Sequence, residues 1–246
     1  MIQLLEKQIK ITSYDVQPNS IVKPSSLQKY MQQIAREDLL QYDITYYNMR
    51  DDGIVFVLVK LALEFYKPIY TEETISLKTW EKEIKGATFI REFEIYRDNE
   101  RVAACSTHWV LLDFIKRSIA RPSRLMYTSN SFPQLSCGVE IEKSIFDRNP
   151  TLYLVGNHTV MYSDLDENNH LNNSIYPDLI MNYAEITSDT NYLHKEIRRM
   201  QINFVTEAVL NDKLNVFTQK FSKGYKTRIL YDKDDKVCVD SVVEYK

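Results

Sequence analysis

The chain has 246 residues, of which 44% are hydrophobic and 26% charged, and its net charge at pH 7 is -3. This composition is ordinary for a folded protein and gives no basic excess with which to bind nucleic acid. Its three cysteines are odd in number and widely spaced, which argues against a disulfide framework and a zinc site. No apolar run approaches the roughly 20 residues of a membrane helix, and the first residues lack a signal core, so we expect a cytoplasmic protein.

The first part of the chain is expected to contain one long helix and several strands. Residues 23–42 are predicted to be helical, because Leu27, Met31 and Ile34 recur at helical spacing and Pro24 stands where an N-terminal proline is tolerated. Apolar runs and alternating patterns predict strands at residues 4–14, 54–66, 74–80, 86–97 and 101–113. A curved antiparallel sheet laid against the helix is the economical way to bury these faces.

A connector follows, and then the pattern returns. Residues 123–150 are predicted to be a linker, because this stretch holds prolines and many serines and shows little periodicity. Arg117 and Arg121 precede it in a local basic cluster, whose simplest interpretation is a solvated surface. We therefore divide the chain into residues 1–122, the linker, and residues 151–246.

The two outer parts are similar to each other in sequence. Leu63 in the first parallels Ile202 in the second, and the surrounding elements keep their order. We therefore predict an internal duplication of one strand–helix–sheet unit. In this alignment Gln17 stands opposite His170, so the polar residues around His170 belong to the second unit alone, which favours a functional site there.

The stretch around His170 is the most distinctive of the sequence. It lies between a predicted strand at residues 152–161 and a predicted helix at residues 176–186. Asp166, Asn168 and His170 alternate, so in an extended backbone their side chains would lie along one edge. A loop between two rigid elements is a suitable place for catalytic groups.

Three other interpretations of this loop compete with a catalytic one. A polar helix-capping loop is one interpretation, since Asn and Asp favour turns and N-caps, and it stays open. A calcium loop is excluded, because Asn169 stands where the glycine belongs and Ile175 where the closing glutamate belongs. One histidine among carboxamides is also a poor ligand set for a transition metal, so we predict no metal site.

The motif from Ser163 to Asn173, Ser-Asp-Leu-Asp-x-Asn-x-His-Leu-Asn-Asn, closely resembles that of the acyl-acyl carrier protein (acyl-ACP) thioesterases of plant plastids and bacteria. The resemblance covers nearly the whole chain and includes Arg-x-x-Ala-Arg-Pro from Arg117 to Pro122. It implies an α+β fold, a tandem double hot-dog in which each half is a long helix wrapped by a curved antiparallel sheet. It also implies hydrolysis of the fatty acyl-ACP thioester, which releases a free fatty acid and ends chain elongation without a cofactor.

The resemblance also assigns roles by position. Asp166, Asn168 and His170 match the loop residues of the family, and Glu207 matches its catalytic glutamate. Thioester hydrolysis needs a base for water, a donor for the oxyanion and a proton for the leaving sulfur. Glu207 suits the base role, and His170 suits either a share of that role or protonation of the leaving sulfur. Asn168 suits the donor, and Asp166 is expected to orient its neighbours. Plant members often carry a cysteine after the glutamate, whereas this chain has Ala208, so we expect direct attack by water.

Substrate contacts are expected in both parts of the chain. Residues 1–122 are expected to hold the acyl chain, with Met31, Ile34 and Val57 as candidate lining residues, and residues 151–246 are expected to hold the catalytic groups. The partner is an acidic acyl carrier protein whose phosphopantetheine arm bears the acyl chain, and a second copy of this chain is a further candidate partner. Cations suit an acidic partner, and the candidates are Arg117, Arg121, Arg198 and Arg199.

Three alternative functions stay open at this point. The chain is also compatible with a thioesterase for coenzyme A esters, with a non-catalytic acyl-binding hot-dog protein, and with a hot-dog dehydratase. The first would need no protein-docking surface, and the second would leave Asn168, His170 and Glu207 without a use. The third uses a histidine with an acidic partner in a different local motif.

Overall fold

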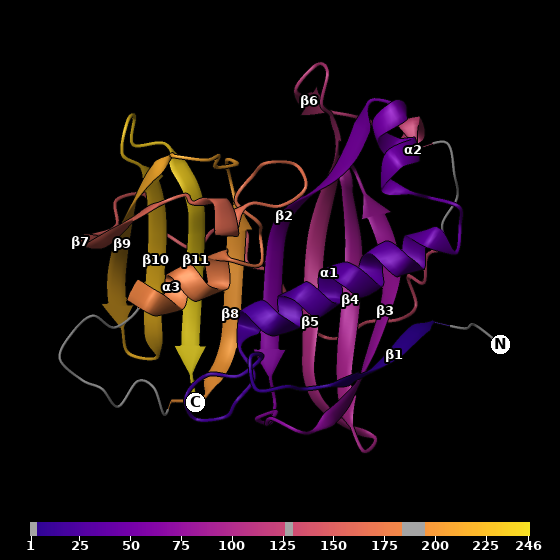
Figure 1. Ribbon diagram of the computed structural model, residues 1–246, viewed down its shortest axis with the longest axis horizontal. Coiled ribbons are helices and arrows are strands. Elements are labelled where there is room, and N and C mark those ends of the chain that lie inside the picture. Colours follow the sequence, from indigo (N-terminus) through magenta and orange to yellow (C-terminus); the bar gives the residue numbers. More distant parts are fainter. Residues whose placement is uncertain (1–3, 126–129, 184–194) are drawn as a thin grey trace.

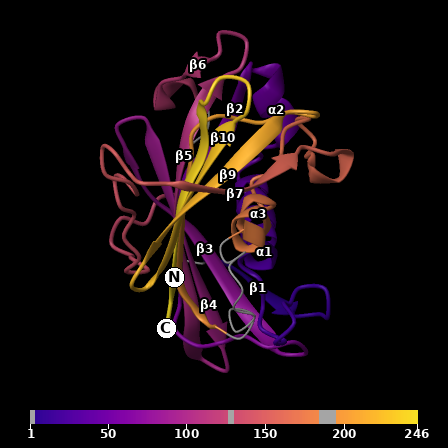
Figure 2. The ribbon, with the colours of Figure 1, turned by 90° about the vertical axis from the view of Figure 1, so that its left-hand side faces the viewer.

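The computed structural model describes residues 4–125, 130–183 and 195–246. Within these ranges the strands form a single antiparallel sheet in the order β1-β3-β4-β5-β2-β8-β11-β10-β9-β7, and β6 pairs with β5 beside this path. The sheet is strongly curved, and both main helices lie on the same face of it (Figures 1 and 2). The predicted combination of long helices and curved antiparallel sheet is confirmed.

The elements follow the predicted order. The first half contains β1 (Leu5–Lys10), α1 (Pro24–Leu40), α2 (Tyr46–Asp51), β2 (Ile54–Phe65), β3 (Thr74–Lys85), β4 (Thr88–Arg97), β5 (Glu100–Asp113), β6 (Ser118–Ile119) and the 3-10 turn η1 (Pro122–Arg124). The second half contains β7 (Tyr153–Thr159), the 3-10 turn η2 (Tyr162–Asp164), α3 (Tyr176–Tyr183), β8 (Ile197–Phe204), β9 (Lys213–Phe221), β10 (Gly224–Tyr231) and β11 (Val237–Tyr245). The short helix α2 was not predicted, and the predicted end of the last helix lies outside the described residues.

The two halves repeat one topology about the β2–β8 junction. Outward from this junction the first half reads β2, β5, β4, β3, β1 and the second reads β8, β11, β10, β9, β7, which is the same order of equivalent strands. Ala62 lies opposite Gln201, and Leu61 lies opposite Ile202. Because the sequence alignment equates Leu63 with Ile202, the junction pairs each strand with its own duplicate around Ala62. The predicted duplication is therefore present in the topology.

Helices α1 and α3 pack on the sheet through their apolar faces. Leu27, Met31 and Ile34 of α1 are buried in the main core together with Leu179 and Ile180 of α3. Burial of each such side chain contributes about 1.5–3 kcal/mol, so the helical spacing of these residues explains the position of α1. The two helices also touch, because Ser25 Oγ donates a hydrogen bond to Asp178 Oδ1 at 2.7 Å.

The stretch from residue 130 to residue 150 crosses the opposite face of the sheet (Figure 2). Cys137 and Val139 pack against Trp80, and Phe146 packs against Val242. The predicted linker therefore connects the halves while burying apolar side chains of its own. Among the helices in the described ranges, none combines the length and apolarity needed to cross a bilayer.

Candidate active site

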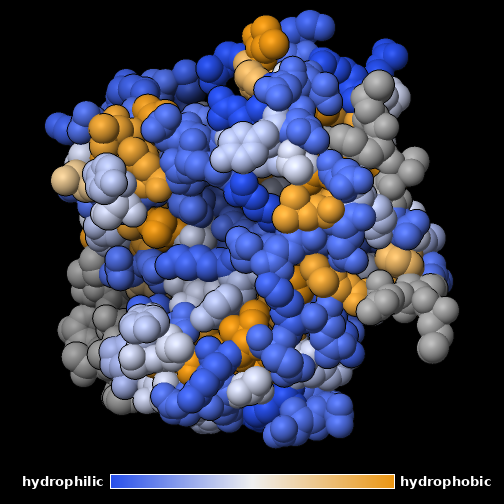
Figure 3. Space-filling view, turned by 45° about the vertical axis from the view of Figure 1, so that its right-hand side comes forward, coloured by the Kyte–Doolittle hydropathy of each residue, from blue (hydrophilic) through white to orange (hydrophobic). Residues whose placement is uncertain are grey.

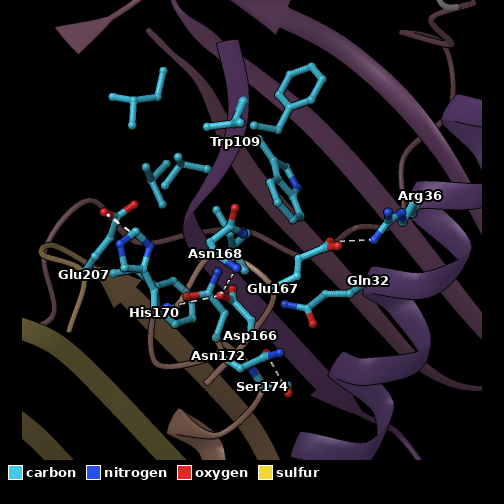
Figure 4. A pocket seen from close by; sticks show the side chains of 18 of the residues that line it. Gln32, Arg36, Trp109, Asp166, Glu167, Asn168, His170, Asn172, Ser174 and Glu207 are labelled. Carbon is cyan, nitrogen blue, oxygen red and sulfur yellow. Dashed lines mark hydrogen bonds and ion pairs between the residues drawn. The ribbon is translucent and has the colours of Figure 1, made fainter. Parts of the chain in front are cut away.

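A cavity of about 1030 Å³ lies between the two halves, and residues of α1 and α2 are part of its lining. Its second-half wall consists of the loop after β7 and the turn after β8, which includes Glu207 (Figure 4). Its first-half wall is largely apolar and includes Leu39, Ile44, Met49, Val57, Phe89 and Trp109. Apolar walls with polar groups gathered at one side are typical of a ligand site.

On the face in Figure 3 hydrophilic side chains dominate and hydrophobic ones form small, separate patches.

The polar loop is fixed against the segment that follows β8. Leu171 N donates to Ala208 O at 2.8 Å, and His170 forms a β-bridge with Val209. This pairing brings His170 beside Glu207, with His170 Nδ1 at 3.6 Å from Glu207 Oε2. The side chains are 33% and 38% exposed, so both remain accessible at the cavity wall. The contact predicted between the loop histidine and the late glutamate is therefore present (Figure 4).

Asp166 shapes the loop through its backbone. The Asp166 carboxylate Oδ1 accepts hydrogen bonds from Asn168 N at 2.8 Å and from His170 N at 3.2 Å. The loop turns tightly because Asn169 adopts a left-handed conformation, with φ of 61°, which asparagine tolerates well. The prediction that Asp166 shares an edge with Asn168 and His170 is wrong, because the backbone here is a turn. The Asp166 carboxylate instead holds both residues through their backbone N–H groups.

Asn168 is held by a residue of the first half. Tyr46, the first residue of α2, donates its hydroxyl hydrogen to Asn168 Oδ1 at 2.5 Å. Arg50 Nη1 in turn donates to the Tyr46 hydroxyl oxygen at 2.7 Å. The sequence analysis missed Tyr46. The sequence signal that could have indicated the start of α2 was Thr45, a residue type favoured at N-caps, which accepts a hydrogen bond from Asn48 N at 3.0 Å.

A second contact joins the loop to the first half. Arg36 of α1 forms an ion pair with Glu167, drawn in Figure 4, in which Nη1 lies 2.7 Å from Oε1. Arg36 also lies over the Tyr46 ring, with its guanidinium carbon 5.3 Å from the ring centroid. Two consecutive residues of the loop, Glu167 and Asn168, are therefore held by helices α1 and α2.

Buried groups behind Glu207 hold its backbone. The Tyr231 hydroxyl donates to the Glu207 carbonyl oxygen, and Cys238 Sγ donates to Thr206 O at 3.2 Å. The Tyr176 hydroxyl lies 3.1 Å from Cys238 Sγ. Burial raises the pKa of Cys238 to about 11 and also raises the pKa of Tyr176 and Tyr231. These groups are therefore neutral near pH 7, and Cys238 supports the turn as an inert thiol.

The predicted acyl-contact residues divide into two groups. Val57 lines the cavity, as predicted. Met31 and Ile34 do not line it, because they lie on the face of α1 that is buried against the sheet, with 2% and 1% exposure. The cavity instead receives Ala35 and other residues from adjacent faces of α1.

The predicted docking cations also divide. Arg117 lines the cavity and is exposed, and Arg121 is exposed nearby in the chain. Arg198 is paired with Glu244 and lies six residues, about 20 Å, before the end of β8 that leads to Glu207. The prediction that Arg199 is a surface cation is wrong, because its side chain is 7% exposed and pairs with Glu64 Oε1 at 2.6 Å.

Comparisons with known proteins agree with this geometry. A protein-family model described as acyl-ACP thioesterase N-terminal domain matches residues 3–124. A second family model, described as acyl-ACP thioesterase C-terminal domain, matches residues 149–242. An acyl-ACP thioesterase from Bacteroides thetaiotaomicron is 21% identical, covers 99% of this chain and 98% of its own, and has a TM-score of 0.86. A 12:0-ACP thioesterase from Umbellularia californica is 14% identical, covers 99% and 97%, and has a TM-score of 0.81. At these identities the two solved structures establish the fold, a double hot-dog.

Proposed function

The chain belongs to the acyl-ACP thioesterase family and hydrolyses the thioester of fatty acyl-ACP, and we propose that Glu207, His170 and Asn168 carry out this reaction. The observation that supports the assignment best is the separation of 3.6 Å between His170 Nδ1 and Glu207 Oε2 at the cavity wall. This distance is longer than the donor–acceptor length of a hydrogen bond, and catalytic contacts commonly tighten only when substrate is bound. The resulting pair is suited to moving a proton beside a thioester.

In the proposed mechanism, water attacks the thioester carbonyl carbon directly. Glu207 takes a proton from the water as its oxygen bonds to carbon, and the carbonyl electron pair moves onto the oxygen. The Asn168 amide group donates to this oxyanion. Glu207 passes the abstracted proton to His170 across their contact. The intermediate then collapses, the carbon–sulfur bond breaks, and His170 gives a proton to the departing sulfur, so water is the only reactant consumed besides the thioester.

Substitution of the two proton carriers tests this assignment. We expect Glu207→Gln and His170→Asn each to lower kcat by about 10²- to 10⁴-fold, since each removes a group that transfers a proton in the transition state. The assay is release of free fatty acid from acyl-ACP, with thermal melting as a check of the fold. Glu100→Gln, at the turn between β4 and β5, is a matched control that should leave kcat unchanged. Full activity in either active-site variant would refute the assignment.

We also propose that the halves divide the work. Residues 1–122 would hold the acyl chain, residues 151–246 would carry the catalytic groups, and residues 123–150 would connect them. The distribution of cavity residues supports this division, since the apolar wall comes from the first half and includes Val57 and Trp109. Asp166, the loop that it shapes and Glu207 come from the second half.

The acidic carrier protein is proposed to approach the exposed cations Arg117 and Arg121, so that its phosphopantetheine arm enters the cavity. Hydrolysis of one acyl group on the carrier and on coenzyme A distinguishes a carrier-specific enzyme from an acyl-CoA thioesterase. Arg117→Glu with Arg121→Glu should raise KM for the carrier substrate by a larger factor than KM for the coenzyme A ester. Equal effects on both substrates would dismiss these cations as a docking surface.

We propose a cytoplasmic enzyme that forms a homodimer. Strand β7 ends the sheet order in the described part of the chain, and its Tyr153 and Leu154 are exposed, which supports an interface at this edge. Light scattering of the purified protein tests the dimer.

A further inference from the structure

Tyr46 lies in a chain of hydrogen bonds that starts at a guanidinium and ends at the proposed oxyanion donor. Arg50 Nη1 donates to the Tyr46 hydroxyl oxygen at 2.7 Å, and that hydroxyl donates to Asn168 Oδ1 at 2.5 Å. Because Arg50 can only donate, the one hydroxyl hydrogen of Tyr46 is left for Asn168. Arg50 therefore sets the donor-to-acceptor direction of both hydrogen bonds.

This direction matters because an amide side chain has two unlike ends. Asn168 can present either its oxygen or its NH₂ group to the cavity that it lines. Only the NH₂ group stabilises an oxyanion, whereas the oxygen would repel it. When Oδ1 accepts from Tyr46, the NH₂ group is left for the cavity. A hydrogen bond that is itself polarised by a cation holds this arrangement more firmly than an isolated one.

We propose that Tyr46 is a positioning residue that fixes the Asn168 amide with its NH₂ group toward the reacting carbonyl, and that Arg50 aligns the Tyr46 hydroxyl. The inference rests on the proposed oxyanion role of Asn168. It assigns to the first half, through α2, a part in the chemistry of the second-half loop. Tyr46 lines the cavity, and in this proposal it acts on the reaction through Asn168 and not on the reacting carbonyl.

The ring and the hydroxyl of Tyr46 can be tested separately. The guanidinium carbons of Arg36 and Arg50 lie 5.3 and 5.5 Å from its ring centroid, within the range of cation–π attraction. Tyr46→Phe keeps the ring and removes the hydroxyl, so the packing of α2 is retained. Tyr47→Phe is a matched control on the same helix, because Tyr47 is exposed and contacts the Tyr46 ring edge-on.

We expect Tyr46→Phe to lower kcat by about tenfold, as the loss of one hydrogen bond that matters only in the transition state. KM and the melting temperature should stay within the spread of the Tyr47→Phe control. Arg50→Met should lower kcat less, since the hydroxyl remains but loses its alignment. Wild-type kcat in Tyr46→Phe overturns the inference.

A double-mutant cycle separates positioning from general support of the fold. Asn168→Ala should lower kcat by about 10²- to 10³-fold, and adding Tyr46→Phe to it should change kcat less than about twofold, because no amide remains to be oriented. An equal effect of Tyr46→Phe in both backgrounds would show a purely structural role and overturn the inference. Wild-type activity in Asn168→Ala would instead refute the oxyanion role of Asn168, which is a separate failure.

Discussion

Removal of the Asp166 carboxylate should impair catalysis by loosening two proposed catalytic residues at once. Its Oδ1 accepts from Asn168 N at 2.8 Å and from His170 N at 3.2 Å. In Asp166→Ala both backbone N–H groups lose this acceptor, so the loop backbone holds the two side chains less firmly. Asp166→Asn keeps a neutral acceptor oxygen at the same place. The two variants should therefore be impaired to different degrees.

The magnitude follows from the two hydrogen bonds. Because the loop is half-buried and water can replace part of each bond, we take about 1 kcal/mol per bond, which is below the roughly 1.5–3 kcal/mol of hydrogen bonds to charged groups. If the chemical step loses this ordering energy in full, Asp166→Ala should lower kcat by roughly 30-fold. Asp166→Asn should lose about half of the energy, which corresponds to roughly fivefold.

A carboxylate with the same local task in the first half provides the control. Asp15 Oδ2 accepts from Thr12 N at 2.8 Å, from Thr12 Oγ1 at 2.6 Å and from the Tyr30 hydroxyl at 2.9 Å. Asp15→Ala should therefore lower the melting temperature and leave kcat on acyl-ACP unchanged. If Asp166→Ala stayed within twofold of the wild type, or if Asp166→Asn were as impaired as the alanine variant, the loop argument would be refuted.

Four further predictions follow from buried or cavity-lining groups. Cys238 should resist alkylation at pH 8 without loss of activity, because its thiol is buried and its pKa is raised to about 11; inactivation by iodoacetamide would contradict this. Arg199→Met should lower the melting temperature by roughly 6–12 °C, because it leaves a carboxylate unpaired, with KM for acyl-ACP unchanged. Val57→Trp should shift the released fatty acids toward shorter chains, and an unchanged product profile would remove Val57 from the acyl site. Desolvation raises the pKa of Asp15, but hydrogen bonds from Thr12 and Tyr30 outweigh it and lower the pKa overall. The stability advantage of the wild type over Asp15→Ala should thus be complete above about pH 4 and diminish as the pH falls further, in melting curves across pH.

Features that depend on local pattern could be predicted from the sequence. The apolar spacing around Leu27 placed a helix at residues 23–42, and the structure has it at Pro24–Leu40. The duplicated order of elements predicted the repeated topology, and the Leu63–Ile202 alignment agrees with the register at the β2–β8 junction. The contact of His170 with Glu207 was predicted by family resemblance, since 37 residues of chain separate them and no local pattern connects them.

Features that depend on distant neighbours were missed or wrong. Helix α2 has six residues, which is too short for a periodic pattern, so Tyr46 could not be connected with the site. The spacing of Met31 and Ile34 shows that they are buried, but not whether they face a cavity or the sheet. Arg199 was expected at the surface because cations suit an acidic partner, yet its partner Glu64 is 135 residues away and is brought close by β2–β8 pairing.

The β2–β8 junction explains how an asymmetric site can arise from two similar halves. Ladder pairing from Lys60 to Glu64 makes one sheet of the two units, so helices of the first half stand at a fixed position relative to the loop of the second. A hydrogen bond of 2.5 Å to Asn168 and an ion pair of 2.7 Å to Glu167 can then be formed before substrate arrives. Preorganised donors stabilise an oxyanion without reorganisation during the reaction. If the halves moved freely, ordering Asn168 would cost free energy at every turnover, so under the proposed mechanism the continuous sheet contributes to catalysis.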